Sequence, residues 1–507
     1  MLANILSGAL IGIDAYPVEV EVDVTQGLPQ FATVGLPEGA VKESKDRVKS
    51  AIKNSGYDFP VRRITVNLAP ADIRKDAASL DLPMAMGILT ATGSCSDKAA
   101  RYLYMGELSL DGRIKAVRGC LAVAVAAKEW DLDGLILPVD NAAEGAVVNG
   151  LPIFAVHNLG QVVAFINNEI ELQPTEIDTS APLAIQGNGE DFSEVRGQQH
   201  VKRALEVAAA GGHNMLMVGP PGSGKTMLAR RLPSILPNLR FAEALETTKI
   251  HSISGLLAKS DALIHTRPFR SPHHTISDAG LIGGGTIPRP GEVSLAHNGV
   301  LFLDELPEFK KNVLEMLRQP LEDGQVGISR AAMSLTFPAS FMMVAAMNPC
   351  PCGYLGDGQH ECTCTPPMLQ RYRNRLSGPL LDRIDLHVEV PRICHEELAN
   401  PNEGESSESI RQRVEQARSH QEQRFQRCGI HANAQMQARH IRKYCAVDSA
   451  GEKLLAIVTD KLGLSARTYS RILKVARTIA DLAGSETICE HHLAEAVQYR
   501  SLDRRAP

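Results

Sequence analysis

A glycine-rich stretch between a short apolar run and a helix-like segment contains the residue types that bind phosphate. Its sequence is Gly219-Pro220-Pro221-Gly222-Ser223-Gly224-Lys225-Thr226, which matches the pattern G-x-x-x-x-G-K-[ST] between a strand and a helix. The glycines let backbone N–H groups surround phosphate oxygens, and the helix start adds partial positive charge. We therefore expect ATP here, with Lys225 at the β- and γ-phosphates and the Thr226 hydroxyl on Mg²⁺. The alternative is an ordinary Gly/Pro-rich turn.

Two adjacent carboxylates end an apolar segment downstream, in the sequence Gly299-Val300-Leu301-Phe302-Leu303-Asp304-Glu305. Four apolar residues followed by acids are typical of a buried parallel strand whose C-terminal end meets a ligand crevice. We expect Asp304 to hold Mg²⁺ through water and Glu305 to polarise the attacking water as general base. The two motifs together predict an ATPase. A strand that merely ends in two solvated acids is the alternative.

The composition limits the class of protein. A chain of 507 residues should form roughly two to four domains. A hydrophobic content of 44% with 4% aromatics favours a helix-rich α/β enzyme. The net charge of −5 provides no global positive field, so any binding of nucleic acid must be local. No membrane-spanning run or convincing signal peptide is present, and ten scattered cysteines do not indicate disulfides, so we expect a cytoplasmic protein.

Residues 1–172 have the pattern of one α+β domain. Four valines from Val18 to Val24 alternate with acidic residues, which predicts a strand with one wet face. Helices are expected over 41–54, 80–92 and 120–128, and strands over 64–68 and 135–138. The order of these elements resembles the proteolytic domain of Lon-type proteases, which has the ribosomal-protein-S5-like fold.

This resemblance assigns the catalytic positions of such a protease. Lys75-Asp76-Ala77-Ala78-Ser79 is similar to the Lon segment around its nucleophile, which places Ser79 at the serine position. The general-base lysine of the family then corresponds to Leu121, and a leucine side chain cannot take a proton. We expect a protease fold without protease chemistry, in which Ser79 is an ordinary residue near a helix start.

A polar linker over 173–190 precedes the nucleotide-binding module, which we expect over 191–395. Asp191–Gln198 resembles the segment that lines the adenine pocket in AAA+ proteins. Arg267–Phe309, read as RPFRSPHHTISDAGLIGGGTIPRPGEVSLAHNGVLFLDELPEF, is similar to the Mg-chelatase-like branch of the AAA+ ATPases. The adjacent histidines His273 and His274 are interpreted as structural, because a metal site needs a third ligand at suitable spacing.

With the Lon-like domain in front, the chain resembles the ComM/YifB family almost end to end. The resemblance implies a homo-hexameric ring that acts on DNA as a branch-migration helicase in natural transformation. Its partners would be branched or single-stranded recombination intermediates. An insertion near 277–289 would project toward the ring pore.

Further elements are expected after Glu305. The residue pattern predicts a helix over 313–323 and strands over 325–329 and 333–337. The resemblance implies that these strands form a hairpin with Arg330 near its tip. Arg330 would contact DNA phosphates, or it is a solvated turn charge. Asn348 ends the next buried strand, at the position called sensor 1, where an amide orients the lytic water.

Two close cysteine pairs follow this strand. Cys350 and Cys352 are separated by nine residues from Cys362 and Cys364. Four thiolates in a short loop can surround a tetrahedral Zn²⁺. The C-x-C spacing is tighter than the usual C-x₂₋₄-C, and the alternative is four reduced thiols in a surface loop.

Two arginines complete the expected catalytic set. Arg383, in the motif Leu380-Leu381-Asp382-Arg383-Ile384-Asp385, matches the arginine finger that reaches the ATP of a neighbouring subunit. Arg467 matches the sensor-2 position of a helical lid expected over 396–507. Arg471 and Lys474 are interpreted as part of a solvated helix face.

The sequence therefore predicts an α/β protein with a P-loop AAA+ core, a helical lid and an N-terminal Lon-like α+β domain. ATP and Mg²⁺ are the expected cofactors, with zinc as a further candidate. DNA translocation with branch migration is the expected activity. The alternatives are the ATPase subunit of a magnesium chelatase, an ATP-dependent protease and an AAA+ remodelling factor that does not act on DNA.

Overall fold

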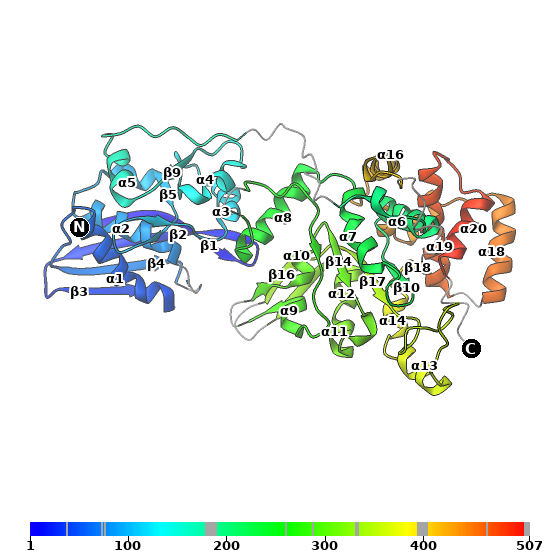
Figure 1. Ribbon diagram of the computed structural model, residues 1–507. Coiled ribbons are helices and arrows are strands. Elements are labelled where there is room, and N and C mark those ends of the chain that lie inside the picture. The colour runs from blue at the N-terminus through cyan, green and yellow to red at the C-terminus, as the bar shows by residue number, and fades with distance from the viewer. Residues whose placement is uncertain are drawn as a thin grey trace. The chain divides into compact units, whose positions relative to one another are not determined.

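The computed structural model describes residues 1–36, 39–71, 73, 75, 78–177, 190–258, 261–285, 288–329, 334–392, 404–462 and 465–500 (Figure 1). The chain forms two compact units. The first contains Met1–Pro182 together with Phe241–Ile264, and the second contains Leu183–Arg240 together with His265–Pro507. Most of the expected linker, at 178–189, lies outside the described residues. The domain boundaries given above remain predictions.

The first unit is built on a mixed seven-stranded sheet in the order β3-β4-β2-β1-β5-β8-β9. Strand β2 pairs antiparallel with β1 and β4, and the remaining pairs are parallel. The alternating valines of β2 point into the core, as the sequence predicts. The strands are β1 (Leu2–Ile11), β2 (Asp14–Thr25), β3 (Gln30–Val34), β4 (Arg63–Ala69), β5 (Tyr102–Tyr104), β8 (Gly134–Pro138) and β9 (Ile153–Val156), with the short pair β6 (Glu107–Leu108) and β7 (Ile114–Lys115).

The helices of this unit divide between separate hydrophobic cores. One core gathers residues of α1 (Gly39–Asn54), α2 (Asp81–Ala91) and α5 (Leu159–Ile166). Another gathers residues of α3 (Cys120–Ala127) and α4 (Val139–Ala146). Helix α2 is almost entirely buried, which explains why its sequence is apolar on all sides.

Helix α8 (Phe241–Ser254) lies within the range expected for the nucleotide-binding module but packs in the first unit. A buried carboxylate explains part of this packing. Glu144 Oε1 accepts hydrogen bonds from the Leu121 backbone N–H, at 2.9 Å, and from the Ser252 hydroxyl of α8. The Ser252 hydroxyl oxygen also accepts from the Gly119 N–H at 3.0 Å. Ser252 therefore joins α8 to the N-terminus of α3.

The second unit has a parallel five-stranded sheet in the order β11-β14-β17-β10-β18. The three central strands are completely or almost completely buried, as expected for a parallel sheet covered on both faces. The strands are β10 (Met215–Val218), β11 (Phe269–Arg270), β14 (Val300–Leu303), β17 (Met342–Met347) and β18 (Leu386–Glu389), and the first helices are α6 (Gln199–Gly211) and α7 (Lys225–Ile235). Strand β17 lies between β10 and β14 and pairs parallel with both. The residues that follow these three strands therefore lie at the same edge of the sheet.

Short elements connect these strands. The expected hairpin is present as β15 (Gln325–Ser329) and β16 (Ser334–Pro338), whereas Arg330 lies outside the described residues. The single helix expected over 313–323 is wrong. The structure has α11 (Lys311–Met316) and α12 (Arg318–Asp323), because Pro320 has no N–H to continue the ladder from α11. The other short elements are α9 (Asp278–Ile282), β12 (Gly283–Gly284), β13 (Arg289–Pro290), α10 (Glu292–Leu295), α13 (Pro366–Arg373) and α14 (Gly378–Leu381).

A helical region completes the second unit, and α18, α19 and α20 lie side by side in it (Figure 1). Its helices are α16 (Ser407–Phe425), α17 (Ala438–Tyr444), α18 (Ser449–Leu462), α19 (Ala466–Leu482) and α20 (Glu490–Gln498). The expected fold class, an α/β core with a helical lid and a Lon-like N-terminal domain, is confirmed. Among the described helices, none has the length and apolar character needed to cross a lipid bilayer.

Candidate nucleotide-binding site

The glycine-rich loop between β10 and α7 has the backbone of a phosphate-binding loop. Gly222 and Gly224 have φ angles of 76° and 87°, which side chains rarely adopt. A Cβ at Gly219 would lie 2.2 Å from the carbonyl oxygen of Val390, so only glycine fits there. Gly224 precedes α7 and supplies no side-chain cap, which leaves the first N–H groups of the helix available for an anion. The loop therefore fits a phosphate group.

Lys225 is the buried cation of this loop. Its Nζ donates to the carbonyl oxygens of Gly219 and Pro220, at 2.7 and 2.9 Å, and lies 3.4 Å from Asn348 Oδ1. Burial lowers the pKa of Lys225, and the charge of Asp304 partly opposes this shift. An ammonium group held by neutral carbonyls is poorly compensated, and phosphate oxygens are its natural partners.

The two expected magnesium ligands lie in direct contact. The Thr226 hydroxyl donates to Asp304 Oδ2 at 2.7 Å, which brings the start of α7 to the end of β14. Hydroxyl and carboxylate oxygens are ligands that Mg²⁺ prefers. These residues therefore fit a magnesium ion, which would neutralise negative charge on the nucleotide phosphates.

Glu305 is exposed beside this pair, with a φ angle of 52°. Its backbone N–H donates to Asp304 Oδ1 at 2.9 Å, and its Oε2 lies 3.4 Å from His274 Nδ1. Sequence reasoning treated His274 as structural and missed this contact. The position of His274 in the sequence was the available signal for this contact. His274 follows β11, which pairs parallel with β14, and the ends of neighbouring parallel strands lie at the same edge of a sheet.

Gln198 ends the segment that resembles an adenine-pocket lining, and the structure gives its side chain a contact that the sequence did not indicate. Its Nε2 donates to the carbonyl oxygens of Ser223 and Pro391, at 2.9 and 3.0 Å. The side chain is buried, and it fixes the glycine-rich loop to the segment after β18. Gln198 therefore positions the loop without facing the reacting groups.

Arg383 and Arg467 line the same cavity, and no residue of the phosphate-binding loop is among the residues that line it. Both line a cavity of about 400 Å³ with Glu322, Arg471 and Lys474. Arg383 is 7% exposed, forms an ion pair with Glu322 and donates to the Pro379 carbonyl oxygen at 2.5 Å. Its Nε has no hydrogen-bond partner among the described residues. Arg383 and Arg467 thus belong to a cluster of cationic side chains around this cavity.

The interpretation of Arg471 and Lys474 as a solvated face is wrong. Arg471 forms an ion pair with buried Asp385, and Lys474 Nζ donates to the Ala434 carbonyl oxygen at 2.8 Å. Burial lowers the pKa of Lys474. Because Arg471 lies on α19, its ion pair with Asp385 fixes this lid helix to the segment that contains Arg383. Asp385 also accepts from His213 Nδ1 at 3.1 Å.

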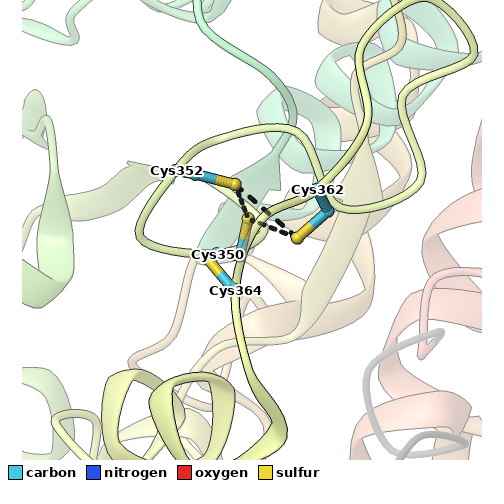
Figure 2. A group of neighbouring side chains, drawn as sticks. All are labelled: Cys350, Cys352, Cys362 and Cys364. Atoms are coloured by element: carbon cyan, nitrogen blue, oxygen red, sulfur yellow. Dashed lines mark hydrogen bonds between the residues drawn. The ribbon is translucent and has the colours of Figure 1, made fainter.

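The four cysteines after β17 also come together. We call Cys350, Cys352, Cys362 and Cys364 the cysteine cluster. Their sulfur atoms all lie within 4.8 Å of one another, and those of Cys350, Cys352 and Cys362 point toward each other (Figure 2). The backbone N–H of Tyr354 donates to the Cys352 sulfur and is the main reason that the pKa of this thiol falls to about 6.

The residues aligned with a Lon-type catalytic pair do not form one. Leu121 is completely buried in α3, where the resemblance would require a lysine. Ser79 is 7% exposed and lies in a short 3₁₀ turn before α2. Glu144, whose Oε1 accepts from the backbone N–H of Leu121, also accepts from the hydroxyl of Ser252.

Comparison with known proteins agrees with this architecture. Residues 191–398 match the family "Magnesium chelatase, subunit ChlI", residues 20–141 match "Subunit ChlI of Mg-chelatase", and residues 404–500 match "Magnesium chelatase, subunit ChlI C-terminal". The chain is 45% identical to Competence protein ComM of Haemophilus influenzae over 510 residues, which cover 99% of this chain and 98% of that protein. The chain belongs to the ComM/YifB family.

Other members and a more distant relative extend this comparison. The chain is 44% identical to the Escherichia coli protein YifB over 505 residues, with 99% of this chain and 98% of YifB covered. It is 30% identical to Lon protease 2 of Bacillus subtilis over 164 residues, which cover 31% of this chain and 30% of the protease. The family is thus a Mg-chelatase-like AAA+ family, for which ATP and Mg²⁺ are the implied ligands.

Proposed function

We propose that this ComM/YifB family member is an ATPase that works as a homo-hexameric ring and drives branch migration of DNA during natural transformation. The grouping of Arg383 with Arg467 carries the proposal of a ring. Both arginines line a cavity whose residues include none of the phosphate-binding loop. A ring of head-to-tail contacts gives every subunit the arginines of its neighbour.

The roles of the residues follow from their chemistry. ATP with Mg²⁺ supplies the phosphoryl group that is transferred to water. Lys225 neutralises the phosphate oxygens, while Thr226 and Asp304 would hold the magnesium ion. Glu305 takes the proton of the attacking water, and Asn348 orients that water. Arg383 of the neighbouring subunit stabilises the charge that develops on the γ-phosphoryl group, with Arg467 as the second cation.

The proposal that DNA is the substrate rests on family membership and on the placement of local elements. The chain is 45% identical, over nearly its full length, to a protein named for competence. The hairpin β15–β16 and the insertion that contains α9 are the proposed DNA-contacting elements. Arg330, which lies in the sequence between the two strands of the hairpin, is the proposed phosphate contact. With an overall net charge of −5, contacts with phosphates must be concentrated on such elements. Zinc is proposed as a structural ion of the cysteine cluster, and the cytoplasm as the compartment.

A synthetic four-way DNA junction tests this function. The wild-type chain with ATP and Mg²⁺ should convert the junction into duplex products on a native gel. Lys225→Ala should bind no ATP and leave the junction intact, and Glu305→Gln should bind ATP without converting it. Robust ATP hydrolysis with no conversion of junctions or forked DNA would exclude the branch-migration activity. A chelatase subunit would in that case be recognised by stimulating the insertion of Mg²⁺ into a porphyrin.

A further inference from the structure

The cysteine cluster lies in the segment that joins the end of β17 to helix α13. Cys350 is buried, whereas Cys352, Cys362 and Cys364 are half-buried. The segment between the two pairs is polar and includes Gly353, Gly356 and Gly358. Burial of apolar surface therefore does not explain why four sulfur atoms converge here.

The sulfur positions fit a tetrahedral metal site better than they fit disulfides. The S···S distances are 3.3 Å for Cys350–Cys352, 3.6 Å for Cys352–Cys362 and 3.8 Å for Cys350–Cys362. A disulfide requires about 2.05 Å. Four Zn–S bonds of about 2.3 Å at tetrahedral angles place the sulfur atoms about 3.8 Å apart. The cluster therefore has nearly the dimensions of a four-thiolate zinc site.

The same segment contacts the ATP site from two directions. Asn348, which faces Lys225, stands two residues before Cys350. Tyr372 of α13, eight residues after Cys364, donates its hydroxyl to the Asn348 carbonyl oxygen at 3.2 Å. In the sequence, the cysteine cluster therefore lies between Asn348 and Tyr372, the residue whose hydroxyl binds the Asn348 carbonyl oxygen.

The second contact is with the phosphate-binding loop itself. A Cβ at Gly353 would lie 2.7 Å from Pro221 Cδ, and Gly353 has a φ angle of 89°. The turn after Cys352 is therefore packed against the loop as closely as backbone allows. A displacement of this turn would be transmitted directly to Pro221.

The outer part of the segment is fixed to the strand end beyond β18. Arg392 pairs with Asp357 at 3.5 Å, and its guanidinium lies 5.7 Å from the ring centre of Tyr354. His360 Nδ1 is 3.1 Å from Asp357 Oδ2. These polar contacts orient the turn, and a metal ion bound by both cysteine pairs would join its two ends.

We infer that one Zn²⁺, bound by the four thiolates of the cysteine cluster, positions Asn348 and the phosphate-binding loop for ATP hydrolysis. This inference rests on the proposed ATPase activity. The zinc ion is structural, because four protein ligands leave no open coordination position. Its effect on catalysis passes through Asn348 and Pro221, so kcat should depend on zinc although the ion touches no substrate.

Metal content tests the site, and ATP hydrolysis tests its role. Full-length protein purified without added zinc should contain about one zinc per chain, and growth with Co²⁺ should give the strong visible absorption of tetrahedral cobalt thiolates. Cys364→Ser should lose zinc and lower kcat about 10–100-fold, with a smaller change in the KM for ATP. Cys428→Ser is the matched control, because the half-buried Cys428 lies outside the cluster.

Two further measurements separate positioning from general damage. A zinc-selective chelator applied to folded wild-type protein should lower kcat, and added Zn²⁺ should restore it. Combining Cys364→Ser with Asn348→Ala should slow hydrolysis by less than the product of the two separate effects, because part of the zinc effect passes through Asn348.

The metal site and its positioning role are contradicted by different results. An active ATPase with neither zinc nor cobalt bands contradicts the metal site. A zinc-free protein with unchanged kcat, or fully additive effects of the two substitutions, contradicts the positioning role. Zinc in a chain that hydrolyses no ATP under any condition overturns the proposed ATPase, and the positioning role with it.

Discussion

Replacing Arg383 by alanine tests the proposal that each ATP site is completed by a neighbouring subunit. In the free subunit Arg383 is 7% exposed, and its guanidinium is held by Glu322 and the Pro379 carbonyl oxygen. Two outcomes can therefore be distinguished. If Arg383 is only a structural ion pair, its loss affects folding. If it is a trans finger, its loss affects catalysis in another subunit.

The expected magnitudes of these two effects differ greatly. The Glu322 side chain is 53% exposed and remains solvated when its partner is lost, so the ion pair contributes about 1 kcal/mol or less to stability. A trans arginine is worth about 10³–10⁵ in rate, equivalent to about 4–7 kcal/mol of transition-state stabilisation. Arg383→Ala should therefore fold and bind ATP, yet hydrolyse it at least about a thousandfold more slowly.

Mixing of variants provides the decisive assay. Arg383→Ala subunits retain the phosphate-binding loop, and Lys225→Ala subunits retain the finger, so each type supplies what the other lacks. In a ring of equal, random composition, about one quarter of the sites combine an intact loop with an intact neighbouring finger. ATP hydrolysis should therefore recover to about a quarter of the wild-type rate, although each variant alone is inactive. Arg101→Ala, which breaks an exposed ion pair with Asp133, is the control and should retain full activity.

One result would contradict a trans role for Arg383. If mass photometry shows mixed rings and hydrolysis does not recover, Arg383 acts within its own subunit or has no catalytic role. Dependence on protein concentration gives a second check. The specific activity of the wild type should rise as rings assemble and then reach a plateau.

Further outcomes are expected at other sites. Lys225→Ala should abolish nucleotide binding in a fluorescent-ATP titration, while Glu305→Gln should bind ATP normally and lose about 10²–10⁴-fold in turnover; full turnover of Glu305→Gln contradicts its role as the base. ATP should stimulate no cleavage of casein by the wild type, because Leu121 replaces the required lysine, and cleavage that disappears in Ser79→Ala would contradict this expectation. Burial lowers the pKa of His387 to about 3, so between pH 6.5 and 3 the unfolded chain binds a proton that the folded chain excludes, and stability falls as pH falls. Urea titrations of His387→Leu should show a shallower decline over this range, by up to about 1.4 kcal/mol per pH unit.

The contiguous motifs could be read from the sequence because their chemistry is local. A phosphate-binding loop needs particular residues at consecutive positions, and Gly219 to Thr226 supply them within a single turn. The apolar run before Asp304 and Glu305 likewise specifies a buried strand that ends in acids. The fold class follows from such signals, since period-two and helical patterns depend on neighbours in the chain.

Contacts between distant segments required the tertiary structure. His274 reaches Glu305 only because β11 and β14 are parallel neighbours, and Gln198 reaches Ser223 only because α6 begins beside the loop. Arg471 looked solvated because its partner, Asp385, lies 86 residues away in the chain. Polar contacts of this kind leave no periodic signal in the sequence.

The sequence alone determined the ATP-binding chemistry and the spacing of the four cysteines. It also determined that position 121 has no proton acceptor. Only the tertiary structure decided that α8 packs in the N-terminal unit through Ser252, that four sulfur atoms converge, and that Gly353 presses on Pro221. The physical reason is that a motif acts through covalent neighbours, whereas packing depends on which surfaces the folded chain brings within a few ångströms.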